Sequence, residues 1–214
     1  MTRFEECRWS FPPRSSWPSD HDVVAAGADL EPDTLLHAYA HGMFPMHLDS
    51  MKEELGWWSP VRRGVIPLDG LRVSKSMRRS ARDFVVTMDT EFERVMVECG
   101  EMRREGRWIT NDFVRSYVRL HGMGHAHSVE VRDAAGGLVG GLYGVRIDRF
   151  FAGESMFHRA TDASKVALMH LVQWLRDTGA ELLDTQWCTP HLASLGCVEI
   201  DRDEYLRRLA LSID

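Results

Sequence analysis

The sequence predicts an α+β fold, because helix-like and strand-like segments are grouped along the chain and do not alternate regularly. Apolar residues at helical spacing precede and follow a central group of strand-like segments between residues 127 and 153. The first 63 residues differ from the rest, since they are rich in Pro, Trp and His and show little periodicity. We therefore expect a small N-terminal α/β lobe over residues 1–63 and a larger domain over residues 64–214.

The expected N-terminal lobe contains one clear helix. Asp33 is a residue type that commonly caps a helix, and Gly42 marks the end of the apolar pattern that follows it. The lobe ends at the sequence Trp57-Trp58-Ser59-Pro60. The paired tryptophans are either a packing plug or a stacking platform for a ligand, and a plug is the commoner explanation for tryptophan.

In the larger domain, short apolar runs predict strands and capping residues before helical patterns predict helices. The expected strands cover residues 64–68, 84–88, 127–131, 138–147, 150–153 and 182–187. The expected helices begin at Ser74, Thr90, Thr110 and Thr161, and two short ones lie near Leu192 and Tyr205. Gly179 is a typical stop for the longest helix. The order is helices, an antiparallel meander, a long helix and a final strand.

Composition and charge exclude several classes of protein. The chain has 214 residues, of which 44% are hydrophobic and 27% charged, as in ordinary globular proteins. Its formal net charge is -6, so any contact with nucleic acid must come from a local basic patch. The chain has neither an apolar run at its start nor a stretch long enough to cross a membrane, and we expect a cytoplasmic location.

The four cysteines predict neither a disulfide framework nor a metal site. Cys7, Cys99, Cys188 and Cys197 form no CxxC pair. Cys188, His191 and Cys197 could be imagined as ligands, but two thiols and an imidazole without a fourth partner make a poor zinc signature. We expect no metal and no cofactor.

Three polar residues are candidates for the active site. Asp184 and Gln186 lie two apart on an expected strand, so their side chains should share a face. Because the flanking leucines indicate burial, the pair is costly unless it is hydrogen-bonded. It is therefore either a network that pins the strand or an active-site pair. Glu154 lies where the preceding strand is expected to end, either as a site residue or as a surface acid.

A basic stripe follows the cap at Ser74. Lys75, Arg78, Arg79 and Arg82 are spaced i, i+3, i+4 and i+7, which places them on one face of a helix. Such a stripe is commonly a solvated surface. In a chain whose net charge is -6, it also favours binding of an RNA backbone through its phosphates.

Several short motifs occur in a specific order along the chain. They are Phe11-Pro12-Pro13, Gly42-Met43-Phe44-Pro45, Trp57-Trp58-Ser59-Pro60, Trp108-Ile109-Thr110, Gly140-Gly141-Leu142-Tyr143-Gly144, Gly153-Glu154-Ser155-Met156-Phe157, Asp184-Thr185-Gln186 and His191-Leu192-Ala193-Ser194-Leu195-Gly196. Each motif alone is weak. Together they resemble the leucyl/phenylalanyl-tRNA–protein transferase family, from about Phe11 to Leu209.

The resemblance implies a Gcn5-related acyltransferase-like domain with a small N-terminal lobe. It also implies transfer of Leu or Phe, less often Met, from aminoacyl-tRNA to the α-amine of proteins that begin with Arg or Lys. Proteins modified in this way are marked for degradation by the N-end rule pathway. The implied site residues are Glu154, Asp184 and Gln186 for catalysis, Trp57, Trp108, Met156 and Phe157 for the aminoacyl group, and Lys75, Arg78, Arg79 and Arg82 for tRNA.

Two other functions compete with this one. An acyltransferase of the same fold would use an acyl-CoA, but the segment from Gly153 to Arg159 lacks the spaced glycines that cradle a pyrophosphate. A non-catalytic module that binds aminoacyl-tRNA would explain the basic stripe but not the three polar residues. Within the transferase hypothesis, three groups are alternatives for accepting the amine proton: Gln186, Asp184 and the tRNA 2′ hydroxyl.

Overall fold

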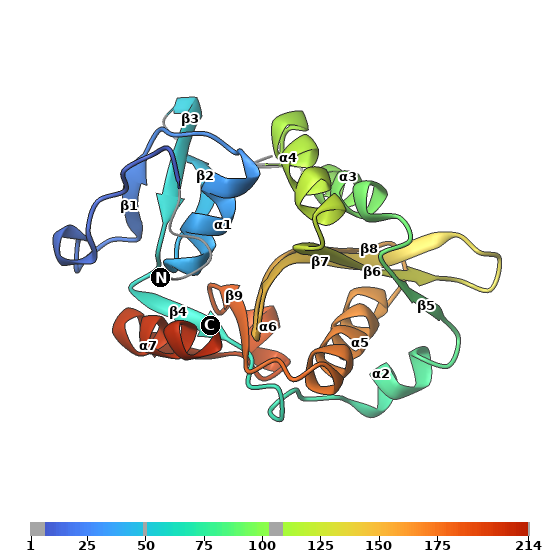
Figure 1. Ribbon diagram of the computed structural model, residues 1–214. Helices are drawn as coiled ribbons and strands as arrows, with labels where there is room; N and C mark the ends of the chain where they lie inside the picture. Colours follow the sequence, from blue (N-terminus) through green and yellow to red (C-terminus); the bar gives the residue numbers. More distant parts are fainter. Residues whose placement is uncertain (1–6, 49–50, 103–108, 214) are drawn as a thin grey trace.

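The computed structural model describes residues 7–48, 51–102 and 109–213. The small lobe contains a 3-10 turn (Arg14–Ser16), helix α1 (Pro32–Ala40) and strands β1 (Val23–Ala26), β2 (Phe44–Leu48) and β3 (Met51–Trp58). The three strands form an antiparallel sheet in the order β1-β3-β2, and α1 packs against β2 (Figure 1). The small N-terminal lobe predicted from the sequence is confirmed.

Helix α1 begins two residues earlier than the sequence pattern suggests. Glu31 occupies the N-cap position with extended backbone, and Pro32 is the first helical residue. Proline suits this position because its missing N–H would have no partner there. The predicted cap at Asp33 is therefore wrong. Asp33 lies in the first turn, where a negative charge interacts favourably with the helix dipole.

The larger domain is built on a mixed sheet with the strand order β10-β4-β9-β8-β7-β6-β5. Its strands are β4 (Arg62–Val65), β5 (Val85–Met88), β6 (Ala126–Arg132), β7 (Leu138–Ile147), β8 (Phe150–His158), β9 (Leu182–Gln186) and β10 (Val198–Asp201). Neighbouring strands are antiparallel except for β8 and β9, which are parallel.

Helices cover both faces of this sheet. They are α2 (Lys75–Ser80), α3 (Phe92–Met102), α4 (Asn111–Gly122), α5 (Ala163–Asp177), α6 (Pro190–Ser194) and α7 (Arg202–Ser212). Figure 1 shows α3 and α4 on one side of β6–β8 and α5 on the other. Helix α2 packs on α5, and α7 lies beside β10, β4 and β9. The predicted α+β class is confirmed, and within the described ranges no helix is long and apolar enough to cross a membrane.

One apolar core joins the two lobes. Its buried members include Leu35 and Trp57 of the small lobe together with Phe113 of α4 and Tyr143 of β7. Strand β4, which follows directly after Trp58 and Pro60, already belongs to the large sheet. The small lobe is therefore held firmly against the larger domain.

Strand β8 is longer than the sequence predicts and contains an irregularity. It continues from Phe150 to His158, whereas the predicted strand ends at Gly153. Tyr143 of β7 pairs with Ser155, but the next residue, Gly144, pairs with Gly153. Glu154 is thus the extra residue of a β-bulge, a feature that redirects a side chain out of the regular pattern. The prediction that Glu154 follows a strand end is wrong.

The parallel strands β8 and β9 stay together for only a short distance. The paired residues are Phe150 with Leu182, Phe151 with Leu183, and Ala152 with Asp184. Both strands lie wholly within the described residues, and no pair joins them beyond Asp184. They therefore separate at the level of Glu154 and Gln186.

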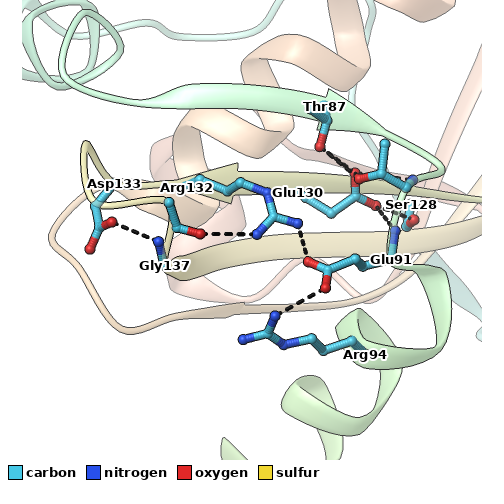
Figure 2. A network of polar contacts seen from close by, with 10 residues as sticks. Thr87, Glu91, Arg94, Ser128, Glu130, Arg132, Asp133 and Gly137 are labelled. Carbon is cyan, nitrogen blue, oxygen red and sulfur yellow. Dashed lines mark hydrogen bonds and ion pairs between the residues drawn. The ribbon is translucent and has the colours of Figure 1, made fainter.

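A polar cluster fastens the other edge of the sheet to the start of α3 (Figure 2). Glu130 is fully buried on β6. Its carboxylate accepts hydrogen bonds from the hydroxyl groups of Thr87 at 2.7 Å, Thr90 at 2.7 Å and Ser128 at 2.6 Å. Arg132 pairs with Glu91 at the beginning of α3. Because the Glu130 carboxylate is supplied with donors from its own fold, we assign this cluster a structural role.

Candidate active site

A cavity of about 280 Å³ lies where β8 and β9 separate. Most of its lining is apolar, and the apolar residues include Leu142, Met156, Leu168, Leu171 and Leu183. Its polar lining includes Glu154, Thr185, Gln186, Thr189 and His191. Phe44, Pro45 and Met46 of β2 also border the cavity, so both lobes contribute to it. The cavity can take an apolar group next to a few polar ones.

Two of the three predicted active-site residues meet in this cavity. The side-chain amide of Gln186 donates a hydrogen bond to Oε1 of Glu154 over 3.3 Å. Tyr39 of α1 also donates to the Glu154 carboxylate. The Tyr39 hydroxyl lies 2.5 Å from the hydroxyl of Tyr117 on α4. Both tyrosines are fully buried, so the small lobe helps to fix Glu154.

The surroundings of Glu154 raise the pKa of its carboxyl group to about 8. Burial is the largest cause, and the hydrogen bond from Tyr39 opposes it. The negative charge of Asp184 raises the pKa further, whereas Arg63 lowers it. Because an α-amine also has a pKa of about 8, proton exchange between the two groups would cost little free energy.

Asp184 is held in a buried ion pair that no local sequence pattern indicates. Arg63 of β4 donates from Nε to Oδ1 of Asp184 over 2.8 Å and from Nη2 to Oδ2 over 2.6 Å. Both side chains are almost completely buried, at 1% and 0% exposure. Burial alone would lower the pKa of Arg63, but the Asp184 carboxylate more than offsets this and raises it. Arg63 and Asp184 therefore form an ion pair in the interior of the protein.

The backbone at Gln186 breaks the regular alternation of β9. Its φ angle is +59°, in the left-handed region that non-glycine residues seldom adopt. The Gln186 N–H donates to Oδ1 of Asp184 over 2.9 Å, which closes a turn between the two residues. As a result Thr185 and Gln186 line the cavity and Asp184 does not. The expectation that Asp184 and Gln186 share one regular face is wrong.

Gly64 lets β4 approach the chain directly after Gln186. A Cβ atom at Gly64 would lie 2.6 Å from the carbonyl carbon of Trp187 and 2.7 Å from the backbone nitrogen of Cys188. These are backbone atoms, which cannot rotate away as a flexible side chain can. Any side chain at this position must therefore displace β9 or β4.

We predict that Gly64→Ala destabilises the protein by about 1–3 kcal/mol, the usual cost of forcing extra atoms into a packed interior. Urea unfolding of the two proteins measures the difference. Gly122→Ala is the matched control, because a Cβ there meets nothing within 4 Å and the substitution should be neutral or slightly stabilising. Equal stability of Gly64→Ala and the unchanged protein would contradict the prediction.

The four residues predicted to bind the aminoacyl group have different positions. Met156 lines the cavity. Phe157 and Trp57 are buried and do not line it; the Trp57 indole donates to the Gly27 carbonyl over 2.9 Å, as a packing plug would. Trp108 lies outside the described residues. Of the three that lie in the described part of the chain, Met156 alone lines the cavity.

The basic stripe lies on and after α2. Ser74 caps this helix, because its hydroxyl accepts the backbone N–H of Met77 over 3.1 Å, as predicted. The helix ends at Ser80, so Arg82 lies just beyond it. The four basic side chains, Lys75, Arg78, Arg79 and Arg82, are exposed, and no ion pair joins them to acids within the described residues. They form a positive surface that is free to meet a partner.

Neither a metal site nor a reactive thiol accompanies the cavity in the described part of the chain. Within residues 7–48, 51–102 and 109–213, no group of three His, Cys, Asp or Glu side chains could hold a metal ion. The four cysteines are free thiols. Burial raises the pKa of Cys197 to about 12, so this thiol stays protonated and is a poor nucleophile.

Sequence patterns did not reveal several residues that shape the site. Arg63, Tyr39 and Tyr205 carry no motif of their own, and the pattern around them resembles that of ordinary core and surface positions. Leu168 and Leu171 of α5, which line the cavity, are spaced as on the apolar face of a helix, a pattern that by itself indicates only core packing. The only available signal for Arg63 is indirect: a buried Asp184 requires a positive partner, which the sequence does not identify.

Comparison with known proteins gives a consistent result over both lobes. The family model described as leucyl/phenylalanyl-tRNA protein transferase matches residues 65–210. The model for the N-terminal domain of the same transferase matches residues 28–61. Solved structures with similarity include FemX, with a TM-score of 0.48, 12% sequence identity and coverage of 83% of this chain and 70% of that chain.

Curated relatives carry the same description. A leucyl/phenylalanyl-tRNA–protein transferase from Pseudoalteromonas atlantica is 46% identical, over 92% of this chain and 85% of that protein. One from Cereibacter sphaeroides is 50% identical, over 84% of each. One from Stutzerimonas stutzeri is 46% identical, over 96% of this chain and 92% of that protein. The chain belongs to the leucyl/phenylalanyl-tRNA–protein transferase family, whose members are aminoacyltransferases.

Proposed function

We propose that this enzyme transfers Leu or Phe, and less readily Met, from aminoacyl-tRNA to the α-amine of proteins whose first residue is Arg or Lys. The observation that carries the proposal is the apolar cavity with Glu154 and Gln186 in its lining. It offers room for an apolar side chain beside groups that can bind and orient an amine. The product would be a protein marked for the N-end rule degradation pathway.

The cavity lining supports an apolar donor side chain. Leucines from β7, β9 and α5, together with Met156, surround it. Unbranched or aromatic side chains fill such a space, whereas Val and Ile carry a branch at Cβ. Discrimination by shape alone contributes about 1–3 kcal/mol, so the preference for Leu and Phe over Val and Ile is expected to be clear but incomplete.

The proposed reaction is aminolysis of an ester. The acceptor nitrogen forms a bond to the aminoacyl carbonyl carbon, and the bond from that carbon to the tRNA 3′ oxygen breaks. The amine gives up a proton, and the departing oxygen gains one. Because an α-amine is partly neutral near neutral pH, orientation and charge stabilisation matter more than a strong base.

Within this reaction, Gln186 and Glu154 have separate roles. Gln186 positions the attacking amine, and Glu154 binds an α-ammonium group of the donor or acceptor. The contact of 3.3 Å between the two side chains supports a shared binding position. The raised pKa of Glu154 supports proton exchange with an amine.

The exposed basic stripe supports binding of the tRNA backbone. Lys75, Arg78, Arg79 and Arg82 can each neutralise a phosphate. At the cavity, burial is the largest cause of the lowered pKa of His191, and the nearby Lys165 and His158 lower it further.

The start of α5 argues against an acyl-CoA as donor. A pyrophosphate would bind the free N–H groups at this helix terminus. Here the N-cap residue is Asp162, whose carboxylate accepts hydrogen bonds from Lys165 at 2.7 Å and Ser80 at 3.3 Å. With Lys165 offsetting the charge of Asp162, the decisive observation is that the segment from Gly153 to Arg159, on the strand before α5, lacks the spaced glycines that cradle a pyrophosphate. We also propose a cytoplasmic location, which the four free cysteines support.

A transfer assay tests the proposal. Purified protein is mixed with tRNA charged with Leu, Phe, Met, Val or Ile and with a peptide that begins with Arg or Lys. We expect the peptide mass to increase by one Leu or Phe residue, less with Met and least with Val or Ile. An N-acetylated peptide is the control, because it lacks the α-amine. Equal transfer to the acetylated peptide, or transfer of acetyl from acetyl-CoA in place of an amino acid, would overturn the proposal.

A further inference from the structure

Arg63 and Tyr205 form the buried support of the active site. Besides its two bonds to Asp184, Arg63 donates from Nη2 to the Tyr205 hydroxyl over 3.1 Å and from Nη1 to the carbonyl oxygen of Gly42 over 3.2 Å. The guanidinium lies 4.2 Å from the centre of the Tyr205 ring and 4.9 Å from that of Phe44. One side chain therefore joins the small lobe, α7 and β9.

These contacts occupy both oxygens of Asp184. Oδ2 accepts from Arg63 and from the Tyr205 hydroxyl, which lies 3.1 Å away. Oδ1 accepts from Arg63 and from the backbone N–H of Gln186. Asp184 has no exposure and does not line the cavity. It is thus poorly placed to receive a proton from a substrate.

The hydrogen bond from the Gln186 N–H to Asp184 connects this network to the position of Gln186. A glutamine with φ of +59° needs support, because most side chains avoid this backbone region. Fixing the Asp184 carboxylate fixes the acceptor of that N–H. The backbone in turn determines where the Gln186 side chain lies, namely 3.3 Å from Glu154 in the cavity.

We propose that Arg63 and Tyr205 are positioning residues for aminoacyl transfer, and that they act on Gln186 through Asp184. This inference rests on the proposed function. It assigns Asp184 to positioning as well, and leaves proton acceptance to groups that face the cavity. Neither Arg63 nor Tyr205 needs to touch a substrate.

The test is a double-mutant cycle on the intact enzyme. Tyr205→Phe removes one hydroxyl and keeps the ring, and we expect kcat to fall about 3- to 10-fold with KM for aminoacyl-tRNA unchanged, because the attacking group is misplaced. In a Gln186→Ala background the same substitution should have no further effect. An equal fall of kcat in both backgrounds would overturn the proposal, because the tyrosine would then act on general stability or elsewhere.

A second pair of variants tests Arg63, with the melting temperature of each variant measured beside its kcat so that a folding defect is recognised. Arg63→Lys retains the positive charge beside Asp184 but loses the two-pronged geometry, and we expect kcat to fall about 10-fold or more. Arg62→Lys is the matched control, since Arg62 is the neighbouring residue of β4 and pairs with Asp201 on the exposed surface. Unchanged kcat in Arg63→Lys would contradict the proposal. If the unchanged enzyme transfers nothing, the proposed function fails, which is a separate result.

Discussion

Glu154→Gln is expected to lower the rate of aminoacyl transfer by about 100-fold, the lower range for losing a group that exchanges a proton in the transition state. The substitution keeps the size of the side chain and its ability to accept the hydrogen bond from Gln186. It removes the negative charge that would bind an α-ammonium group. The measurement is single-turnover transfer from Leu-tRNA to a peptide beginning with Arg, at saturating enzyme.

The pH profile separates this role from a structural one. In the enzyme without bound substrate, the carboxyl group of Glu154 ionises only as the pH approaches its pKa of about 8. The value of kcat/KM for the unchanged enzyme should therefore rise up to that pH. A bound ammonium group favours the carboxylate, so the corresponding rise in kcat should occur at lower pH. Glu154→Gln should keep only the rise caused by ionisation of the amine itself. A wild-type rate and profile in this variant would exclude the assigned role.

Stability measurements provide the control for folding. Because burial raises the pKa of Glu154 from 4.5 to about 8, the folded protein holds an extra proton between these values and loses stability as the pH rises through them. Glu154→Gln cannot ionise, so its melting temperature should increase relative to the unchanged protein between pH 5 and 9. Glu199→Gln, an exposed change on β10, should alter neither rate nor this difference.

Replacing Lys75, Arg78, Arg79 and Arg82 together with Ala should weaken tRNA binding by about 100-fold near physiological salt, because about four phosphate contacts disappear. The slope of the logarithm of affinity against the logarithm of salt concentration should fall by about three. Alanine preserves helix α2, since it favours helices more than the residues it replaces. Filter binding at several salt concentrations measures both quantities.

The matched control removes four positive charges elsewhere. Arg115, Arg119, Arg207 and Arg208 are exposed, and each pairs with an acid on the protein surface. Their replacement with Ala gives the same change of net charge without touching the stripe. If both quadruple variants lose the same affinity, the stripe is not a specific contact and only overall charge matters.

Sequence patterns predicted most of the elements that depend on local chemistry. The cap at Ser74, the strand over residues 138–147 and the helix before Gly179 are confirmed, because each follows from neighbouring residues. The end of β8 could not be predicted, since its continuation through Glu154 depends on pairing with β7. The left-handed backbone at Gln186 depends likewise on a hydrogen bond to Asp184.

The sequence alone determined the α+β class, the basic stripe and, through ordered motifs, the family. These properties depend on residue types and on short spacings along the chain, which are visible without knowledge of the tertiary structure. Only the tertiary structure decided which residues share the cavity, that Trp57 is buried away from it, and that Arg63 and Tyr205 hold Asp184. The residues that pair with a buried charge lie far from it in the sequence. They come together only when strands and lobes pack, so no local sequence pattern identifies them.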